Sequence, residues 1–296
     1  MPDDLLYVAT DADGRAVTAA GEVRWNLPDG GPAAETVAGE VPLVLYEVAG
    51  LIEALEAEIY RAEATGKVLA RVDGSLEVAA ARLVARTAWD TERAARFAID
   101  CARHALGDNG SVALPDGTTL GTVLENASRF LDAYGEAAEP HLGFLARLAA
   151  ARRLRRSGEA VADVALVTLS DDTAHALDAL DDPTWATLAA VVDAVLAAVE
   201  TLRHVALPRY VESREEVVEE HSASEPAEPA SFIMTPWGPV AAGAEHLSPY
   251  VPAWVSARDA AERARDAARD RAGAAGEASE RAFQAARLAE LLAGPA

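Results

Sequence analysis

Residues 42–66 read PLVLYEVAGLIEALEAEIYRAEATG, and this stretch has the most regular apolar pattern in the chain. Its apolar side chains recur in steps of three and four residues, at Leu45, Val48, Ile52, Leu55, Ile59 and Ala62. This spacing puts them on one face of an α-helix, and the glycine that follows, Gly66, is a typical end for one. The stretch therefore predicts an amphipathic helix whose apolar face packs against other helices.

The rest of the chain extends this pattern. A helix is predicted from about Ser75 to Gly107, where the glycine ends it. Further helices are predicted downstream, at about 118–134, 140–156, 159–180 and 183–207. Residues 5–27 instead hold short β-prone runs separated by turn-forming residues, which predict two or three short strands. The predicted fold class is all-α: a helical bundle over 40–207, preceded by a small β element and connector at 1–39.

The C-terminal part of the chain has two segments of different character. Residues 208–255 include a run rich in Glu, Ser and Pro that cannot bury enough apolar surface to order itself. We predict a flexible acidic linker there, followed by an apolar segment. Residues 256–296 carry alanines at heptad spacing and predict a separate helix of coiled-coil type, with a hinge at Gly273 and Gly276. We expect this helix to be ordered by packing on another helix, either of the bundle or of a second copy.

Composition and charge exclude several classes of function. The chain has 296 residues, of which 51% are hydrophobic, and a net charge of −22. So acidic a chain is unsuited to binding a nucleic-acid backbone, which requires clustered Lys and Arg. Cys101 is the only cysteine, so neither an internal disulfide nor a cysteine-based zinc site can form. No signal peptide or membrane-spanning run is recognised, which predicts a cytoplasmic protein with no membrane partner.

Asp90 is the first candidate functional residue. On the helix predicted from Ser75 to Gly107, it falls inside the apolar stripe. Burying a carboxylate alone is costly, so Asp90 has to be paired, protonated or coordinated to a metal ion. Two interpretations stay open: a metal ligand or proton carrier, and an acid that is paired with an arginine of a neighbouring helix or exposed where the stripe leaves the bundle.

Asp193, Glu200 and His204 share one face of the predicted helix at 183–207, at spacings of seven and four. Facing inward, they would provide the carboxylate and imidazole ligands of a divalent metal site in a bundle. Facing outward, they are the solvated face of an amphipathic helix, which the alanines beside them favour. His104 and His175 each have an acid three or four residues away and complete the candidate metal ligands.

An arginine cluster is unusual in so acidic a chain. It consists of Arg152, Arg153, Arg155 and Arg156. The cluster ends the helix predicted at 140–156, where cations stabilise the helix dipole. The functional alternatives are an anion site and a contact for the acidic segment of the same chain or of another copy.

The sequence contains no catalytic signature. A nucleophile elbow, a Walker A loop and a dinucleotide-binding fingerprint are all absent. The leading hypothesis is therefore a non-enzymatic interaction or assembly protein, without a cofactor, that acts through helix–helix association with a protein partner or with itself as a homo-oligomer. The alternative is a metal-dependent helical-bundle enzyme that uses some of the carboxylates and histidines named above.

Overall fold

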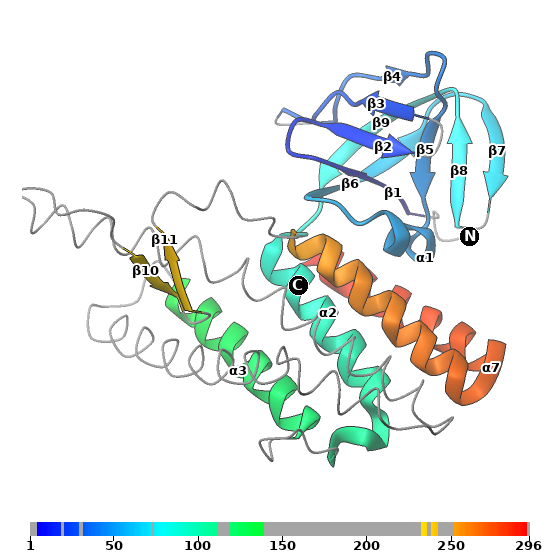
Figure 1. Cartoon of the computed structure of the whole chain (residues 1–296). Coiled ribbons are helices and arrows are strands. Elements are labelled where there is room, and N and C mark those ends of the chain that lie inside the picture. Colours follow the sequence, from blue (N-terminus) through cyan, green and yellow to red (C-terminus); the bar gives the residue numbers. More distant parts are fainter. Residues whose placement is uncertain are drawn as a thin grey trace, which may run out of the picture.

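The structure of this chain is a computed structural model. It describes residues 5–18, 21–29, 32–72, 74–111, 119–138, 232–235, 238–241 and 252–294. Within these residues, most strands gather at one end of the molecule, and the long helices α2, α3 and α7 lie beside one another below them (Figure 1). None of the described helices is long and apolar enough to cross a membrane.

A seven-stranded antiparallel sheet dominates the N-terminal part of the chain. Its strands lie in the order β4-β9-β6-β1-β5-β8-β7. Their bounds are Leu6–Thr10 (β1), Thr36–Val37 (β4), Leu43–Tyr46 (β5), Glu58–Ala64 (β6), Val68–Val72 (β7), Ser75–Val78 (β8) and Ala80–Arg86 (β9). A separate hairpin of β2 (Arg15–Thr18) and β3 (Gly21–Arg24) packs on one face of this sheet.

The sheet curls because four of its strands belong to one long, bent hairpin. β6 leads into β7 and β8 leads into β9, and the two runs pair with each other. At the bend, Thr65 N donates to Ala80 O at 3.0 Å, and Ala79 N donates to Lys67 O at 2.9 Å. On either side of the bend, β6 also pairs with β1, and β8 pairs with β5. The curled sheet encloses one apolar core, which includes Leu43, Leu45, Leu76, Val78 and Leu83.

Helices cover the other face of the sheet. The helical elements are α1 (Val48–Leu51), α2 (Thr91–Leu106), α3 (Leu120–Ala138), α7 (Ala253–Ala293) and the 3-10 turns η1 (Ile52–Ala54) and η2 (Gly107–Ser111). A further, separate hairpin consists of β10 (Phe232–Thr235) and β11 (Gly238–Ala241). α7 is broken at Ala272 and Gly273, where Gly273 has a φ of 64° and the chain reverses. Its two halves run antiparallel, as the hydrogen bond from Arg265 to Gln284 requires.

A second apolar core joins the two ends of the chain. It includes Tyr7 and Ile59 from the sheet, Phe97 from α2, Leu124 from α3 and Leu288 from α7. At the contact between α2 and α7 the side chains are small, which allows the two helix backbones to approach closely. The fully buried alanines of this contact include Ala94, Ala98, Ala257, Ala260, Ala261 and Ala264. The C-terminal helix is therefore part of the core and is not separate.

The predicted all-α helical bundle is wrong, and the stretch at 42–66 shows why. Instead of one helix, it forms β5, the short turns α1 and η1, and β6. The apolar side chains are buried as expected, but Leu45 and Ile59 lie on two different strands. Apolar residues spaced by three and four suit a strand–turn–strand unit as well as a helix, and pairing with β1 and β8 decides between them. The coiled coil predicted for the C-terminus is likewise not supported.

The second predicted helix is also partly wrong. Residues 75–86 form β8 and β9, and α2 begins only at Thr91. Its predicted end is confirmed, because Gly107 follows the last helical residue with a φ of 48°. The predicted N-terminal strands, the helix near 118–134 and the interruption at Gly273 are confirmed as β1–β3, α3 and the break in α7. The helices predicted at 140–156, 159–180 and 183–207 and the acidic linker lie outside the described residues.

Candidate functional site

The free edge of the sheet at β7 is its most unusual surface. Among the residues that the structure describes, β7 is the last strand in the sheet order and pairs only with β8. Three of the seven large apolar side chains exposed in the described residues lie on this one strand: Val68 at 46%, Leu69 at 52% and Val72 at 58%. Edge strands are normally protected by charge, shortness or cover, because their free backbone groups can pair with another chain. β7 therefore combines a free edge with apolar side chains.

A β-bulge distributes these side chains over both faces of the edge. The register with β8 shifts between Val68 and Ala70. As a result, Val68 lies opposite Val78, whereas Val72 lies opposite Ser75. Positions 75 and 78 are three apart on one strand and so point to opposite faces. An incoming strand at this edge would find an apolar side chain on each face.

The turn at the end of β7 is held in place by the segment that follows β5. Glu47 N donates to the carbonyl oxygen of Gly74 at 2.8 Å. The guanidinium of Arg71 lies 3.1 Å from the carboxylate of Glu47. Gly50 packs so closely on Gly74 that no side chain fits between them. The end of the edge strand β7 is therefore held in place by its contacts with Glu47 and Gly50.

The opposite edge of the sheet differs in length. β4 consists of Thr36 and Val37 only, and it pairs with β9. Val37 is 68% exposed, so exposure of an apolar side chain is not unique to β7. A two-residue strand offers too few backbone groups for stable pairing, because short edges are one of the ways in which proteins avoid edge-to-edge contacts.

A cavity of about 240 Å³ lies between the sheet and the helical layer. Its walls come from β1, β2, β3, β5, η1 and α7. Apolar strand residues form much of the lining, together with Trp25 and Tyr46, and the charged groups are Glu53, Glu56 and Arg258. β1 and β5 have one registered pair, Tyr7 with Tyr46, and both strands contribute residues beside this pair to the lining.

The carboxylates of the cavity differ in their surroundings. Glu53 Oε1 lies 2.8 Å from the guanidinium of Arg265 and 3.3 Å from that of Arg281, so its charge is compensated. Burial raises the pKa of Glu56, although the nearby Arg258 and the indole of Trp254 partly offset this effect. Burial also raises the pKa of the Tyr46 hydroxyl, which therefore stays neutral.

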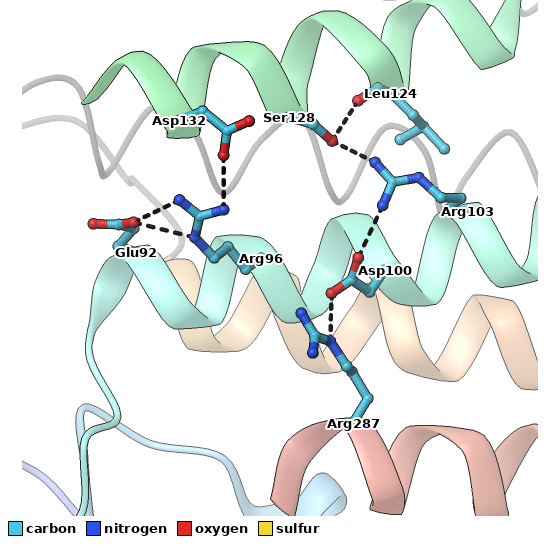
Figure 2. A network of polar contacts seen from close by, with 8 residues as sticks. All are labelled: Glu92, Arg96, Asp100, Arg103, Leu124, Ser128, Asp132 and Arg287. Atoms are coloured by element: carbon cyan, nitrogen blue, oxygen red, sulfur yellow. Dashed lines mark hydrogen bonds and ion pairs between the residues drawn. The ribbon is translucent and has the colours of Figure 1, made fainter. Parts of the chain in front are cut away.

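Polar contacts tie α2 to its two neighbouring helices (Figure 2). Arg96 binds Glu92 of its own helix at 2.9 Å and Asp132 of α3 at 3.1 Å. Asp100 accepts from Arg103 at 3.0 Å and from Arg287 of α7 at 2.6 Å. Because these groups are partly exposed, each pair contributes about 0.2–1 kcal/mol. These contacts fix the relative positions of the helices, and none of the residues that make them lines the cavity.

A second polar network is buried between α2 and the two halves of α7. Gln284, which is 0% exposed, accepts from Arg265 at 2.9 Å and donates to Glu280 and to Ala261 O, each at 2.9 Å. Glu280 also contacts His104 of α2. Because Arg265 and Glu280 are both buried, their charges have to be compensated through this network. The network explains why the polar side chains of Arg265, Glu280 and Gln284 lie within the otherwise alanine-rich contact between the helices.

The structure gives Asp90 and His104 separate roles. Asp90 is the N-cap of α2: its Oδ1 accepts from Arg93 N at 2.8 Å, and its Oδ2 lies 2.6 Å from the Arg93 guanidinium. His104 contacts Glu280 and stacks on the Phe283 ring at 3.8 Å between centroids. Within the part of the chain that the structure describes, no three His, Cys, Asp or Glu side chains come together as metal ligands would. The remaining candidates lie outside the described residues: His175, Asp193, Glu200, His204, Arg152, Arg153, Arg155 and Arg156.

Sequence patterns gave little indication of the groups that the structure brings together. The cavity takes residues from both ends of the chain, from Val8 to Arg258. For the buried polar network, one signal was available in the sequence: Arg265 and Gln284 are polar residues within an otherwise alanine-rich helix face. No family model, curated protein or solved structure matches this chain.

Proposed function

We propose that this chain is a non-enzymatic assembly protein that associates with a second copy of itself, edge to edge, through β7. The observation that carries the proposal is the concentration of exposed Val68, Leu69 and Val72 on a five-residue free edge. Main-chain hydrogen bonds between two such edges would provide affinity, and the apolar side chains would be removed from water.

A second copy is favoured as the partner because two identical edges can satisfy each other. Antiparallel pairing of β7 with its copy is a two-fold contact that closes on itself and leaves no free edge at β7. The local charge permits it despite the net charge of −22. Arg71 is paired with Glu47, and Lys67, the only lysine in the chain, precedes the strand.

Association through the C-terminal helix is not proposed. The alanine face of α7, which suggested it, is buried against α2 within one chain. The metal-dependent enzyme is not proposed either, because no observation favours it. The cytoplasmic location expected from the sequence stays a prediction.

The test is the mass of the full-length protein in solution, measured by light scattering at micromolar concentrations. We expect a dimer for the natural chain and a monomer for the double variant Val68→Lys/Val72→Lys, because two lysines on each edge repel and must be desolvated on pairing. Val37→Lys is the matched control, since it places the same charge on an exposed valine of the opposite edge. A monomeric natural chain, or a double variant that stays dimeric, would refute the proposal.

A crosslink identifies the surface directly. Burial raises the pKa of the Cys101 thiol well above its usual value, so this thiol is unreactive in the folded protein. Ala70→Cys, at the middle of β7, should therefore give crosslinked dimers with a short bis-maleimide. Val37→Cys should not. The opposite result would move the interface to β4.

A further inference from the structure

The cavity between the sheet and α7 has the dimensions of a small-molecule site. Its volume of about 240 Å³ compares with about 30 Å³ per molecule in liquid water, so it has room for a small organic molecule. The hairpin β2–β3 forms one wall, and η1 and α7 form the other. β1 and β5, which are in register at Tyr7 and Tyr46, contribute further lining residues.

Two hydrogen-bond donors in its walls have no partner among the residues that the structure describes. Trp25 is only 3% exposed, and its indole N–H makes no hydrogen bond to any residue of the described ranges. The Tyr46 hydroxyl is half-buried and likewise has no hydrogen-bond partner among those residues. Buried polar groups in folded proteins are normally hydrogen-bonded, so unpaired donors around a cavity indicate an acceptor inside it.

Arg258 provides a positive charge in the same cavity. Its half-buried guanidinium forms no ion pair within 4.0 Å with any acid that the structure describes. The other two arginines near this site, Arg265 and Arg281, are engaged by Glu53. Arg258 interacts with Glu56 only beyond this distance, where it lowers the Glu56 pKa, so its N–H groups stay available to a ligand, and their planar arrangement matches a carboxylate.

We propose that the cavity binds a small organic carboxylate through Arg258, the Trp25 indole N–H and the Tyr46 hydroxyl. The acids of the cavity do not oppose this binding. Glu53 is neutralised by its two arginines, and Glu56 is closer to neutrality than a surface glutamate because burial raises its pKa. An ammonium ligand is disfavoured, since it would meet the Arg258 charge and find Glu53 already occupied. Most of the surface that the cavity exposes is polar, which favours a small, polar carboxylate over one with a long carbon skeleton.

The test is isothermal titration of the full-length protein with acetate, benzoate, inorganic phosphate and ethylammonium. We expect one site for a carboxylate and a loss of roughly tenfold or more in affinity for Arg258→Gln, because a charge-assisted hydrogen bond is removed. Arg263→Gln is the matched control: Arg263 lies on the same helix but pairs with Asp266 at 3.8 Å. Val68→Lys/Val72→Lys should bind equally well, which separates this site from the dimer contact.

A second readout reports direct contact with the indole. In a ¹H–¹⁵N spectrum, the indole resonance that Trp25→Phe removes should be the one that shifts on adding the carboxylate. Phenylalanine keeps an aromatic ring at this position and removes the part of the indole that carries the N–H. The proposal is overturned if ethylammonium or phosphate binds more tightly than both carboxylates. It is equally overturned if Arg258→Gln binds as the natural chain does, or if neither carboxylate binds at millimolar concentration.

Discussion

Replacing Gly50 with alanine tests how tightly the support of the edge strand is packed. Gly50 lies in α1 without a positive φ, so helix propensity alone favours alanine by about 1 kcal/mol. A Cβ at this position, however, would lie 2.2 Å from the carbonyl oxygen of Gly74 and 2.7 Å from its carbonyl carbon. Contacts under 3.0 Å essentially never occur, and here the obstacle is backbone that cannot rotate away.

The backbone at Gly74 must therefore shift by about 0.8 Å, and the same oxygen accepts the hydrogen bond from Glu47 N. Overpacking of this kind costs about 1–3 kcal/mol, and a weakened hydrogen bond adds about 1 kcal/mol, so the loss exceeds the propensity gain. We expect Gly50→Ala to lower the free energy of unfolding by about 1–3 kcal/mol in urea denaturation.

The control for this prediction is Gly39→Ala. A Cβ at Gly39 meets nothing within 4 Å. The substitution should therefore be neutral, or raise the free energy of unfolding by about 0.4–1 kcal/mol because alanine lowers the conformational entropy of the unfolded chain. If Gly50→Ala and Gly39→Ala unfold at the same urea concentration, the close packing of the two glycines is refuted.

Three further predictions concern the core and the cavity. Gln284→Leu should lower the free energy of unfolding by about 1–3 kcal/mol, because the buried Arg265 and Glu280 each lose a hydrogen-bond partner. Glu290→Ala on the exposed face should change it by less than about 0.5 kcal/mol, and equal values for the two variants would contradict the buried network. The pKa of Glu56 is raised in the folded protein, so the folded chain keeps a proton that the unfolded chain loses near pH 4.5, and the free energy of unfolding should fall as pH rises above 4.5. Glu56→Gln should remove this fall in urea titrations at pH 4 and 7. An unchanged pH dependence would argue against the raised pKa. Deleting residues 252–296 should abolish cooperative thermal unfolding measured by circular dichroism, since it exposes the faces of α2 and the sheet that α7 covers, and a stable truncated protein would show that α7 is dispensable.

Local signals allowed parts of the fold to be predicted from the sequence. Gly107 ends α2 and Gly273 breaks α7, both with positive φ, which glycine adopts at little cost. These features depend on single residues and their immediate neighbours. Asp90 carried an equally local signal that was not used: an aspartate before Thr91 and Glu92 is a typical N-cap, and it would have placed the start of α2 correctly.

The sheet could not be predicted because its decisive contacts are distant in sequence. β6 is a strand because Leu6 pairs with Ala62 and Tyr60 pairs with Arg86, and neither contact is visible in the period of residues 42–66. The same is true of the candidate site. Val68 and Val72 are ordinary strand residues, and they become an exposed edge only because β7 is last in the sheet order.

The support of β7 links the proposed interface to the stability of the whole chain. β7 ends at the turn that Gly50 and Glu47 hold. η1, which follows α1, is fixed to α7 through Glu53 and Arg265. The edge is thus preorganised by contacts that also stabilise the fold, which lowers the entropy lost on association. Two kinds of variant should therefore behave differently. Gly50→Ala should weaken folding and association together. Val68→Lys/Val72→Lys should weaken association and change the unfolding transition of the monomer little, because both side chains are about half exposed.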